Sequence, residues 1–415
     1  MQLIHKINNK FFNLDLNYLG KNSFYTLFSY SISILVTLVI TYLIANYLDE
    51  HTTGIYRYVF SWYGIISIFT LGGMASAITI SIAKKNDALL QALKYKALFS
   101  ILGFFVTLIL ASYYFYKGSF EISYAFFALA ISIPFLEISS VFSSYFQGKE
   151  NFKSMAFFSI IGKVTALLFT TLAIFYFKTP ASLIFAGILF VGLAQAIYSF
   201  KYYKFEKSKE NKVIDTNLLN KSLHFSAMGI LYTLGAQADK IILFTFFGSG
   251  ALAAYWIATT IPLEIQRFAT QISSIYFPKL VQKDSDDKIA HKAFKYKFLK
   301  IIFIFSFLLL LLSLLYYFLA PFIFQILFPK YLSSMFISQM FFFTIVFTPF
   351  LFIWQYFLAQ GYIKINYFFH TIDPILQIIL YFIFIYIFGI FGVIYAIFIK
   401  NFLMSIIAIL ILRKK

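Results

Sequence analysis

The 415-residue chain contains no cysteine, and only 12% of its residues are charged. The absence of cysteine excludes disulfide bonds, thiolate metal sites and cysteine nucleophiles. Soluble domains carry about 25% charged residues, so the low charge argues against a soluble fold. The five histidines are scattered without the spacing of metal ligands. We therefore expect no metal site. We also expect no bound cofactor and no enzymatic activity, on grounds given below.

The sequence also lacks a phosphate-binding loop of the nucleotide-binding type. The glycine clusters closest to one are Gly72-Gly73 and Gly248-Ser249-Gly250, and neither is followed by the Lys-Ser/Thr pair that such a loop requires. This absence excludes ATP-driven pumping by this chain alone.

Long apolar runs make up most of the chain: 61% of the residues are hydrophobic, and the mean hydropathy is +0.82. One transmembrane helix needs about 20 apolar residues. The runs between charged and turn residues predict an all-α polytopic membrane protein of about twelve helices. The predicted spans are 23–48, 55–82, 97–116, 122–146, 154–177, 181–200, 222–246, 251–277, 299–320, 334–358, 367–388 and 390–411.

Basic residues are distributed unevenly over the connections between these spans. The formal net charge is +18, and with both termini on the cytoplasmic side, 26 of the 34 Lys and Arg residues lie inside and four outside. Positive residues gather on the cytoplasmic side of membrane proteins. The excess charge is therefore explained by topology, and we expect no nucleic-acid partner.

An internal repeat divides the chain into two halves. Pro134-Phe135-Leu136 is followed by Gln147-Gly148, and Pro349-Phe350-Leu351 by Gln360-Gly361. The long inner loop lies between the sixth and seventh spans, so we predict a six-helix bundle at 1–203, a cytoplasmic linker at 204–220 and a second six-helix bundle at 221–415. In transporters built from such repeats, the substrate site lies between the bundles near the membrane midplane.

Ionisable residues within the predicted spans are the candidates for function, because a charge in the bilayer core costs about 2.5–3.5 kcal/mol on insertion scales. Four are acidic and four basic, so pairing between helices and a role in a substrate or ion pathway are both open. These residues are Glu137, Lys163, Asp239, Lys240, Glu264, Arg267, Asp373 and Lys400.

Two pairs among them have informative spacings. Glu264 and Arg267 are three residues apart and share one helix face, so Arg267 either faces a substrate or forms a local ion pair. Asp239 and Lys240 are adjacent and lie about 100° apart around a helix. We therefore expect one of them to face a cavity and the other a neighbouring helix.

The other candidates have two readings each. Lys163 and Lys400 either contribute to function or extend to the membrane surface. Arg57, at the outer mouth of the second span, is an interfacial anchor or lines a cavity. Asp373 directly precedes Pro374 and Glu137 follows Pro134 by three residues, so each either takes up a proton or cation or caps a helix break.

Four stretches of the chain resemble a known transporter family. The first is Leu48 to Gly73, which contains Gly54-Ile55-Tyr56 and Leu71-Gly72-Gly73, and the second is Phe146-Gln147-Gly148 to Phe152-Lys153. The third begins with Ala238 to Leu243 and continues to Phe247-Gly248 and Ala254-Tyr255. The fourth is Ile326 to Tyr331. Together they resemble the Wzx-type polysaccharide flippases of the multidrug/oligosaccharidyl-lipid/polysaccharide (MOP) exporter superfamily, whose fold is MATE-like. The chain departs from the family at Pro329 and at Ala253 or Ala254, where the family has glycine.

The resemblance implies a function. Such proteins move an undecaprenyl-pyrophosphate-linked oligosaccharide repeat unit, such as an O-antigen unit, from the cytoplasmic to the periplasmic leaflet by alternating access. The headgroup would need a cationic cavity, because Arg and Lys hold phosphate oxygens. In order of preference, the candidate substrate-binding residues are Arg267, Lys240, Arg57, Lys163 and Lys400. The candidates for coupling to H+ or Na+ are Asp239, Glu264, Asp373 and Glu137.

Competing functions remain at this stage. A MATE-like drug or cation exporter would require an acidic cavity. A membrane-embedded glycan polymerase or ligase would present a large outer loop, whereas the longest outer connection here is near 321–333. A structural scaffold does not explain eight charges within spans. We expect a multi-pass protein of the bacterial inner membrane, with the lipid bilayer, a lipid-linked oligosaccharide and other polysaccharide-assembly proteins as partners.

Overall fold

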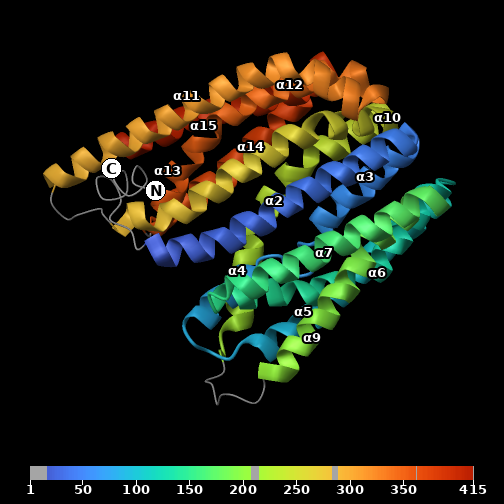
Figure 1. The fold of residues 1–415 in the computed structure, drawn as a ribbon, viewed down its shortest axis with the longest axis horizontal. Coiled ribbons are helices and arrows are strands. Elements are labelled where there is room, and N and C mark those ends of the chain that lie inside the picture. Colours follow the sequence, from blue (N-terminus) through green and yellow to red (C-terminus); the bar gives the residue numbers. More distant parts are fainter. Residues whose placement is uncertain (1–15, 207–214, 283–287, 361, 415) are drawn as a thin grey trace. The chain divides into compact units, whose positions relative to one another are not determined.

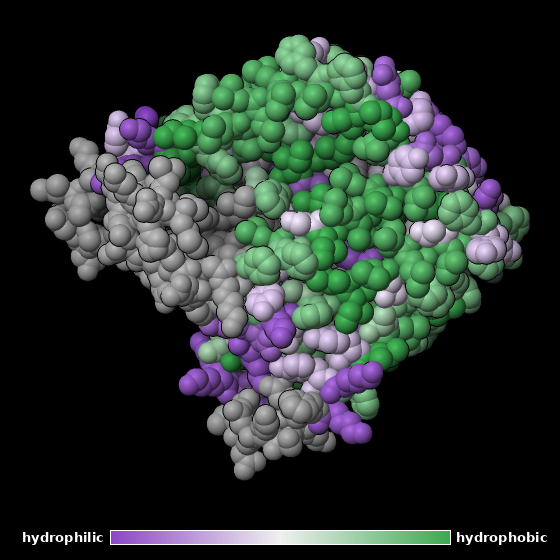
Figure 2. All heavy atoms as spheres, in the orientation of Figure 1, coloured by the Kyte–Doolittle hydropathy of each residue, from purple (hydrophilic) through white to green (hydrophobic). Residues whose placement is uncertain are grey.

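The computed structural model describes residues 16–206, 215–282, 288–360 and 362–414, and the structural statements below concern these residues. They form helices joined by turns, without a β-strand. Ten helices are long and apolar enough to cross a membrane, which confirms the predicted all-α polytopic class. On the face drawn in Figure 2, apolar side chains cover much of the helical surface.

The ten helices cover eleven of the twelve predicted spans. Helix α10 (Leu218–Gln282) contains the seventh and eighth predicted spans, and the non-helical backbone of Gly248, with φ 82°, divides it between them. The second predicted span is two shorter helices, α3 (Glu50–Ile66) and α4 (Met74–Ala83). These two cases account for the difference in number.

Contacts group the chain into two compact units, which we describe separately. The N-terminal unit is Phe28–Trp256, and the C-terminal unit is Met1–Leu27 with Ile257–Lys415. The six-helix bundles at 1–203 and 221–415 are a division by internal repeat and stay a prediction.

The N-terminal unit is arranged around helix α6, which packs against α3, α4, α5, α7, α8 and α9 (Figure 1). Many of the side chains along α6 are small or apolar and are buried, such as those of Ala125, Phe126 and Leu129. The helices not yet delimited are α2 (Leu16–Tyr47), α5 (Leu89–Tyr116), α6 (Phe120–Gly148), α7 (Phe152–Leu172), α8 (Pro180–Ile184) and α9 (Phe190–Glu206), with π-helical turns η1 (Ala173–Phe177) and η2 (Phe185–Leu189).

Helix α3 is capped by Asp49, whose side chain accepts a hydrogen bond of 2.9 Å from the amide of Thr52. Such a side-chain cap satisfies one of the free amides of the first turn. The helix ends at Ile66, and a series of turns through Gly72-Gly73 leads into α4. The second span is therefore broken in its middle.

Three glycines of α3 and of the turn before α4 lie against the first part of α10. A Cβ at Gly54 would collide with the backbone of Ser249, one at Gly64 with the side chain of Gln237, and one at Gly73 with the backbone of Phe225. The residue numbers rise along one segment as they fall along the other, so the two run antiparallel. Glycine permits this close approach because it has no side chain. We call this contact the glycine seam.

The segment that enters α10 is held by Asp215. Its carboxylate accepts hydrogen bonds from Ser81 Oγ at 2.6 Å, from Lys221 Nζ at 2.8 Å and from the Asn217 amide at 3.0 Å. Burial raises the pKa of this carboxyl, but the donors, led by Lys221 and Ser81, lower it more. The pKa of Asp215 is thus below its ordinary value of 3.8.

The C-terminal unit has its own apolar core. Tyr316 stacks on Phe342 with ring centroids 4.3 Å apart, and its hydroxyl lies 2.7 Å from Ser338 Oγ. The tenth predicted span is interrupted by a 3-10 segment that contains Pro349. The elements are α11 (Lys288–Leu327), η3 (Pro329–Ser334), α12 (Met335–Phe343), η4 (Thr344–Phe350), α13 (Leu351–Ala359), α14 (Ile363–Phe388) and α15 (Ile390–Lys414).

Candidate functional site

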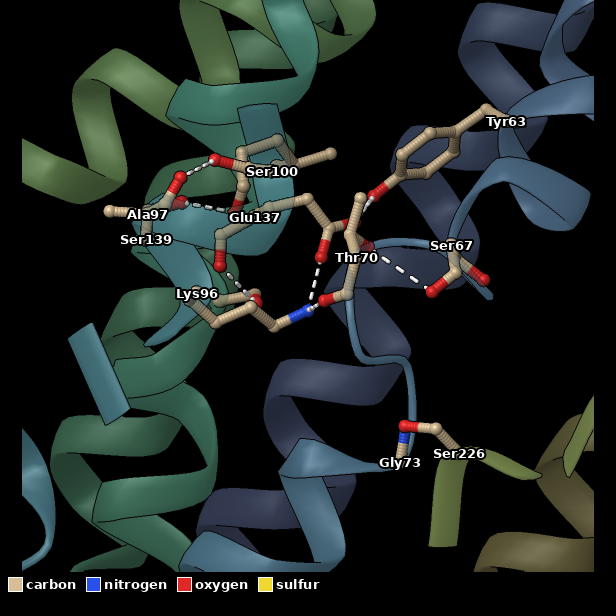
Figure 3. A network of polar contacts seen from close by, with 12 residues as sticks. Tyr63, Ser67, Thr70, Gly73, Lys96, Ala97, Ser100, Glu137, Ser139 and Ser226 are labelled. Atoms are coloured by element: carbon tan, nitrogen blue, oxygen red, sulfur yellow. Dashed lines mark hydrogen bonds and ion pairs between the residues drawn. The ribbon is translucent and has the colours of Figure 1, made fainter. Parts of the chain in front are cut away.

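A buried ion pair lies inside the N-terminal unit. Glu137 is on α6, one turn beyond Pro134, and its Oε2 pairs with Nζ of Lys96 on α5 (Figure 3). The Tyr63 hydroxyl on α3 donates to the other carboxylate oxygen at 2.8 Å. Glu137 and Lys96 are each 5% exposed. A buried charge of either sign is tolerated only when it is paired and hydrogen-bonded, as both are here.

Lys96 also stabilises the break in the second span. Its Nζ donates to the carbonyl of Thr70 at 2.8 Å, and Thr70 lies in the turns between α3 and α4 (Figure 3). Within a membrane, backbone groups released by a helix break must find partners inside the protein. The lysine therefore connects the carboxylate of α6 to the interrupted backbone.

A cavity of about 190 Å³ adjoins this pair. Its volume accommodates several water molecules, and its hydroxyl-bearing wall supplies the hydrogen-bond partners that such waters need. Glu137 thus has a polar space beside it, unlike a carboxylate enclosed by apolar side chains. The lining residues are Ser67, Gly72, Ala75, Ile78, Lys96, Glu137, Ser140, Val141 and Ser144.

Arg57 lies among aromatic rings of the same unit. Its guanidinium carbon is 4.5 Å from the ring centroid of Trp256 and 5.1 Å from that of Phe60. Aromatic faces attract cations at such distances. Arg57 is half-buried, so the rings orient a cation that is still partly accessible.

Asp239 and Lys240 form an ion pair with each other, and the expectation that one faces a cavity and the other a neighbouring helix stays a prediction. Lys240 Nζ lies 2.9 Å from Asp239 Oδ1 and 2.8 Å from the carbonyl of Ala236, one turn back. Tyr255 donates to the second oxygen of Asp239 at 2.8 Å. Adjacent positions do point apart, but a lysine side chain is long and flexible enough to fold back along the helix.

Glu264 and Arg267 form the local ion pair that their spacing allows. Arg267 Nη1 lies 2.7 Å from Glu264 Oε1. The two ends differ in burial: the side chain of Glu264 is 8% exposed and that of Arg267 is 62% exposed. The carboxylate therefore fixes a guanidinium most of whose surface stays available.

The remaining predicted residues lie on three other helices. Lys400 on α15 pairs with Asp373 on α14 at 3.1 Å, and both side chains are largely buried. This contact joins the last two helices. Lys163 is half-buried on α7. Among the described residues, no group of three His, Cys, Asp or Glu side chains is placed to hold a metal ion.

Sequence reasoning missed Lys96 and Tyr63 as members of the buried network. Lys96 was assigned to the inner connection, whereas α5 begins earlier, at Leu89, and carries Lys96 into the helix. A signal was present, because Glu137 lies in a predicted span and needs a basic partner from a neighbouring helix.

Comparison with solved structures identifies the class of fold. A multidrug resistance MATE family transporter of the MOP superfamily, in an inward-facing conformation, is 15% identical with a TM-score of 0.67, over 92% of this chain and 94% of that one. A MOP superfamily transporter from Pyrococcus furiosus is 14% identical with a TM-score of 0.66, over 96% and 95%. The chain has the MATE-like fold of MOP superfamily transporters.

Sequence comparison identifies the family. Residues 19–284 match the family of polysaccharide biosynthesis proteins. A protein of Shigella flexneri named "Putative O-antigen transporter" is 24% identical over 277 residues, which are 63% of this chain and 66% of that protein. This chain belongs to the polysaccharide biosynthesis protein family.

Proposed function

We propose that this protein is a flippase, which moves lipid-linked oligosaccharide repeat units from the cytoplasmic to the periplasmic leaflet by alternating access. Its family and the name of its Shigella relative support a substrate from polysaccharide assembly. A hydrophilic glycan with a pyrophosphate cannot cross hydrocarbon unaided, because burying its polar groups without partners is costly. The protein would supply those partners.

Arg267 is the observation that carries the proposal. Arg267 lies on a helix long and apolar enough to span the membrane, and its side chain is 62% exposed. An ionisable residue in such a helix marks a candidate functional site. Glu264 occupies one of its nitrogens and leaves the other donors for a ligand. Guanidinium matches phosphate oxygens in a two-pronged geometry, which suits the pyrophosphate of the substrate.

The other candidate substrate-binding cations differ in how many donors they can offer to a ligand. Arg57, oriented by aromatic rings, is the second choice, since sugar rings also stack on aromatic side chains such as Trp256. Lys240 and Lys400 are engaged by Asp239 and Asp373, so they have fewer donors to offer. Lys163 stays a candidate on α7.

Coupling to H+ or Na+ is part of the proposal. The four candidate carboxylates are Asp239, Glu264, Asp373 and Glu137, and each has a basic partner. Of these, Glu137 lines the described 190 Å³ cavity, so it is our first candidate for taking up the coupling ion.

Two alternatives have less support. A MATE-like exporter of cationic drugs would use uncompensated carboxylates, whereas all four candidate carboxylates are paired with Lys or Arg. A polymerase or ligase would need catalytic groups, and the relatives described above are transporters. We propose a non-enzymatic protein of the bacterial inner membrane with cytoplasmic termini, which works beside other polysaccharide-assembly proteins.

Complementation tests this proposal. A panel of strains that lack their own glycan flippase would express the wild-type chain, Arg267→Ala, or the matched control Arg413→Ala at the exposed end of α15. We expect surface polysaccharide from the wild type and the control in at least one strain, and its loss with Arg267→Ala at equal membrane abundance.

Two results would contradict the proposal. If Arg267→Ala also restores surface polysaccharide, Arg267 is not the headgroup ligand. If the wild type restores none, and reconstituted vesicles do not move a polyprenyl-pyrophosphate oligosaccharide between leaflets, the flippase function is wrong.

A further inference from the structure

The ammonium of Lys96 has the surroundings of a bound metal cation. Its Nζ contacts the carboxylate of Glu137 and donates to the carbonyl of Thr70 at 2.8 Å (Figure 3). A carboxylate and a backbone carbonyl are oxygen ligands of the kind that hard metal cations prefer. The two contacts of this buried ammonium are therefore contacts that a small metal cation would also make.

The carbonyl comes from a part of the backbone that is not helical. Thr70 lies in the turns between α3 and α4, where the second predicted span is broken. In membrane transporters, backbone carbonyls of unwound helix segments coordinate Na+. The break in this span places a carbonyl of that kind opposite the carboxylate of Glu137, with the ammonium of Lys96 between them.

Hydroxyl oxygens line the cavity beside the ammonium. Ser67 donates its proton to the carbonyl of Gly64 at 2.6 Å, and Ser140 donates to the carbonyl of Glu137 at 2.7 Å. A hydroxyl that donates its proton keeps two lone pairs for other partners. Both serines line the cavity of about 190 Å³, together with Lys96 and Glu137. This cavity has room for water molecules, which complete the coordination of a cation.

Both oxygens of the Glu137 carboxylate are already engaged. Tyr63 donates to Oε1 at 2.8 Å, and Lys96 contacts Oε2. A metal cation at this carboxylate would have to compete with the ammonium for the same oxygen. It can therefore take its place there only when the ammonium is removed.

We infer that the ammonium of Lys96 occupies an alkali-cation site formed by Glu137, the Thr70 carbonyl and the serines of the cavity. The wild-type protein binds neither Na+ nor K+ there, and removal of the lysine side chain opens the site to an alkali cation. The consequence for coupling rests on the proposed function: of H+ and Na+, only H+ remains for Glu137. The site itself does not depend on what the protein transports.

Substitutions of Lys96 separate the effect of its charge from that of the space it fills. Lys96→Ala removes the ammonium and frees its position, whereas Lys96→Met removes the ammonium but fills that position with an apolar side chain. The double variant Lys96→Ala/Glu137→Gln also removes the charge of the carboxylate ligand. Lys94→Ala is the matched control on the same helix, because Lys94 is exposed on α5.

Salt-dependent unfolding and ion binding test the inference. Each full-length protein would be purified in detergent with NaCl and KCl, and then transferred to NaCl, KCl or choline chloride at equal ionic strength. Thermal unfolding would be measured in each salt. Binding would be measured with radioactive Na+, and with radioactive Rb+ in place of K+.

We expect Lys96→Ala to unfold at a higher temperature in NaCl or KCl than in choline chloride. A ligand that binds only the folded state stabilises it, so the folding equilibrium constant should rise about tenfold for each tenfold increase in cation concentration well above the dissociation constant. The variant should also bind the matching radioactive ion saturably. The wild type, Lys96→Met, the double variant and Lys94→Ala should show neither effect.

Three outcomes overturn the inference: equal unfolding of Lys96→Ala in all three salts, the same salt dependence in Lys96→Met, or cation binding by the wild type that Glu137→Gln abolishes. Lys96→Ser is a second variant with a short side chain. If neither Lys96→Ala nor Lys96→Ser folds in NaCl and KCl, an alkali cation does not replace the ammonium, and the inference is wrong.

These measurements use no lipid-linked substrate, so their outcome is separate from that of the complementation test. A cation site in Lys96→Ala without restored surface polysaccharide by the wild type supports the site and rejects the flippase. Restored polysaccharide without a cation site in Lys96→Ala rejects the site alone.

Discussion

The two ion pairs Lys96–Glu137 and Glu264–Arg267 have the same kinds of charge but opposite surroundings. In the first, both side chains are buried, at 7% and 6% exposure, and every partner comes from the interior of the N-terminal unit. In the second, the acid is buried and the base is 62% exposed. The Lys96–Glu137 pair therefore holds helices together, whereas Glu264 holds the guanidinium of Arg267 in a position where it stays available to a ligand.

The strongest test of this comparison removes one partner of the buried pair. Lys96→Met leaves the carboxylate of Glu137 without its cation, so we expect a loss of about 3–5 kcal/mol in stability. The double variant Lys96→Met/Glu137→Leu should recover most of this loss, because no unpaired charge remains. Unfolding in detergent with increasing urea measures both.

The matched comparison is Arg267→Met, for which we expect a smaller loss of stability than for Lys96→Met, because solvent screens the exposed guanidinium end of this pair, whereas both ends of the Lys96–Glu137 pair are buried. Equal losses for Lys96→Met and Arg267→Met would abolish the distinction between the two pairs.

A second test asks whether the N-terminal unit is as tightly packed at the glycine seam as at its ion pair. Gly54→Ala places a Cβ against the backbone of Ser249, so we expect a loss of about 1–3 kcal/mol. Gly229→Ala on α10 meets no atom within 4 Å and should stabilise the helix by up to about 1 kcal/mol. Thermal unfolding of the two variants should therefore shift in opposite directions, and a shift in the same direction would refute the seam.

A third test concerns the exposed pair. Arg267→Lys keeps the charge but loses the two-pronged donor geometry of guanidinium. We expect transport to fall about tenfold, the equivalent of one charge-assisted hydrogen bond of ~1.5 kcal/mol, with stability unchanged. Vesicle transport assays measure the first quantity and thermal unfolding the second. Full transport by Arg267→Lys would show that charge alone is sufficient.

The smallest effect is expected at Asp215, a polar site outside the spans. Its pKa is lower in the folded than in the unfolded protein, so the unfolded state binds more protons and stability rises with pH in this range. The contribution is present above the unfolded pKa near 3.8 and is lost as the pH falls through the folded pKa. Wild type and Asp215→Asn should differ at pH 6 and converge below about pH 4, in unfolding curves taken across that range. A difference that stays constant with pH would contradict this assignment.

Hydrophobic runs predicted the class of fold well, because a membrane-spanning helix requires about 20 apolar residues in sequence. The orientation inferred from the connection charges stays a prediction. The break inside the second span was not predicted. The turns of this break are stabilised by Lys96, which comes from a different helix. The sequence pattern around the break cannot show a hydrogen-bond partner that comes from another helix.

The candidate charges could be found from sequence, but their contacts only in part. The i,i+3 spacing of Glu264 and Arg267 allowed the ion pair that the structure shows, because helix geometry places both side chains on one face. The contact between Asp239 and Lys240 depends on how a flexible side chain folds back, and that of Lys400 with Asp373 depends on the packing of α14 against α15. Neither of these two contacts follows from the spacing of the residues in the sequence.

The glycine seam also has a consequence for the order of biosynthesis. The face of α3 that carries Gly54 and Gly64 is covered by residues of α10 that are translated about 170 to 200 residues later. Until the ribosome has passed Trp256, the N-terminal unit lacks one of its helices, and the glycine face of α3 lacks the segment that covers it. A nascent chain stopped near residue 203 is thus an unfinished bundle, whereas one stopped after residue 256 contains every helix of the N-terminal unit.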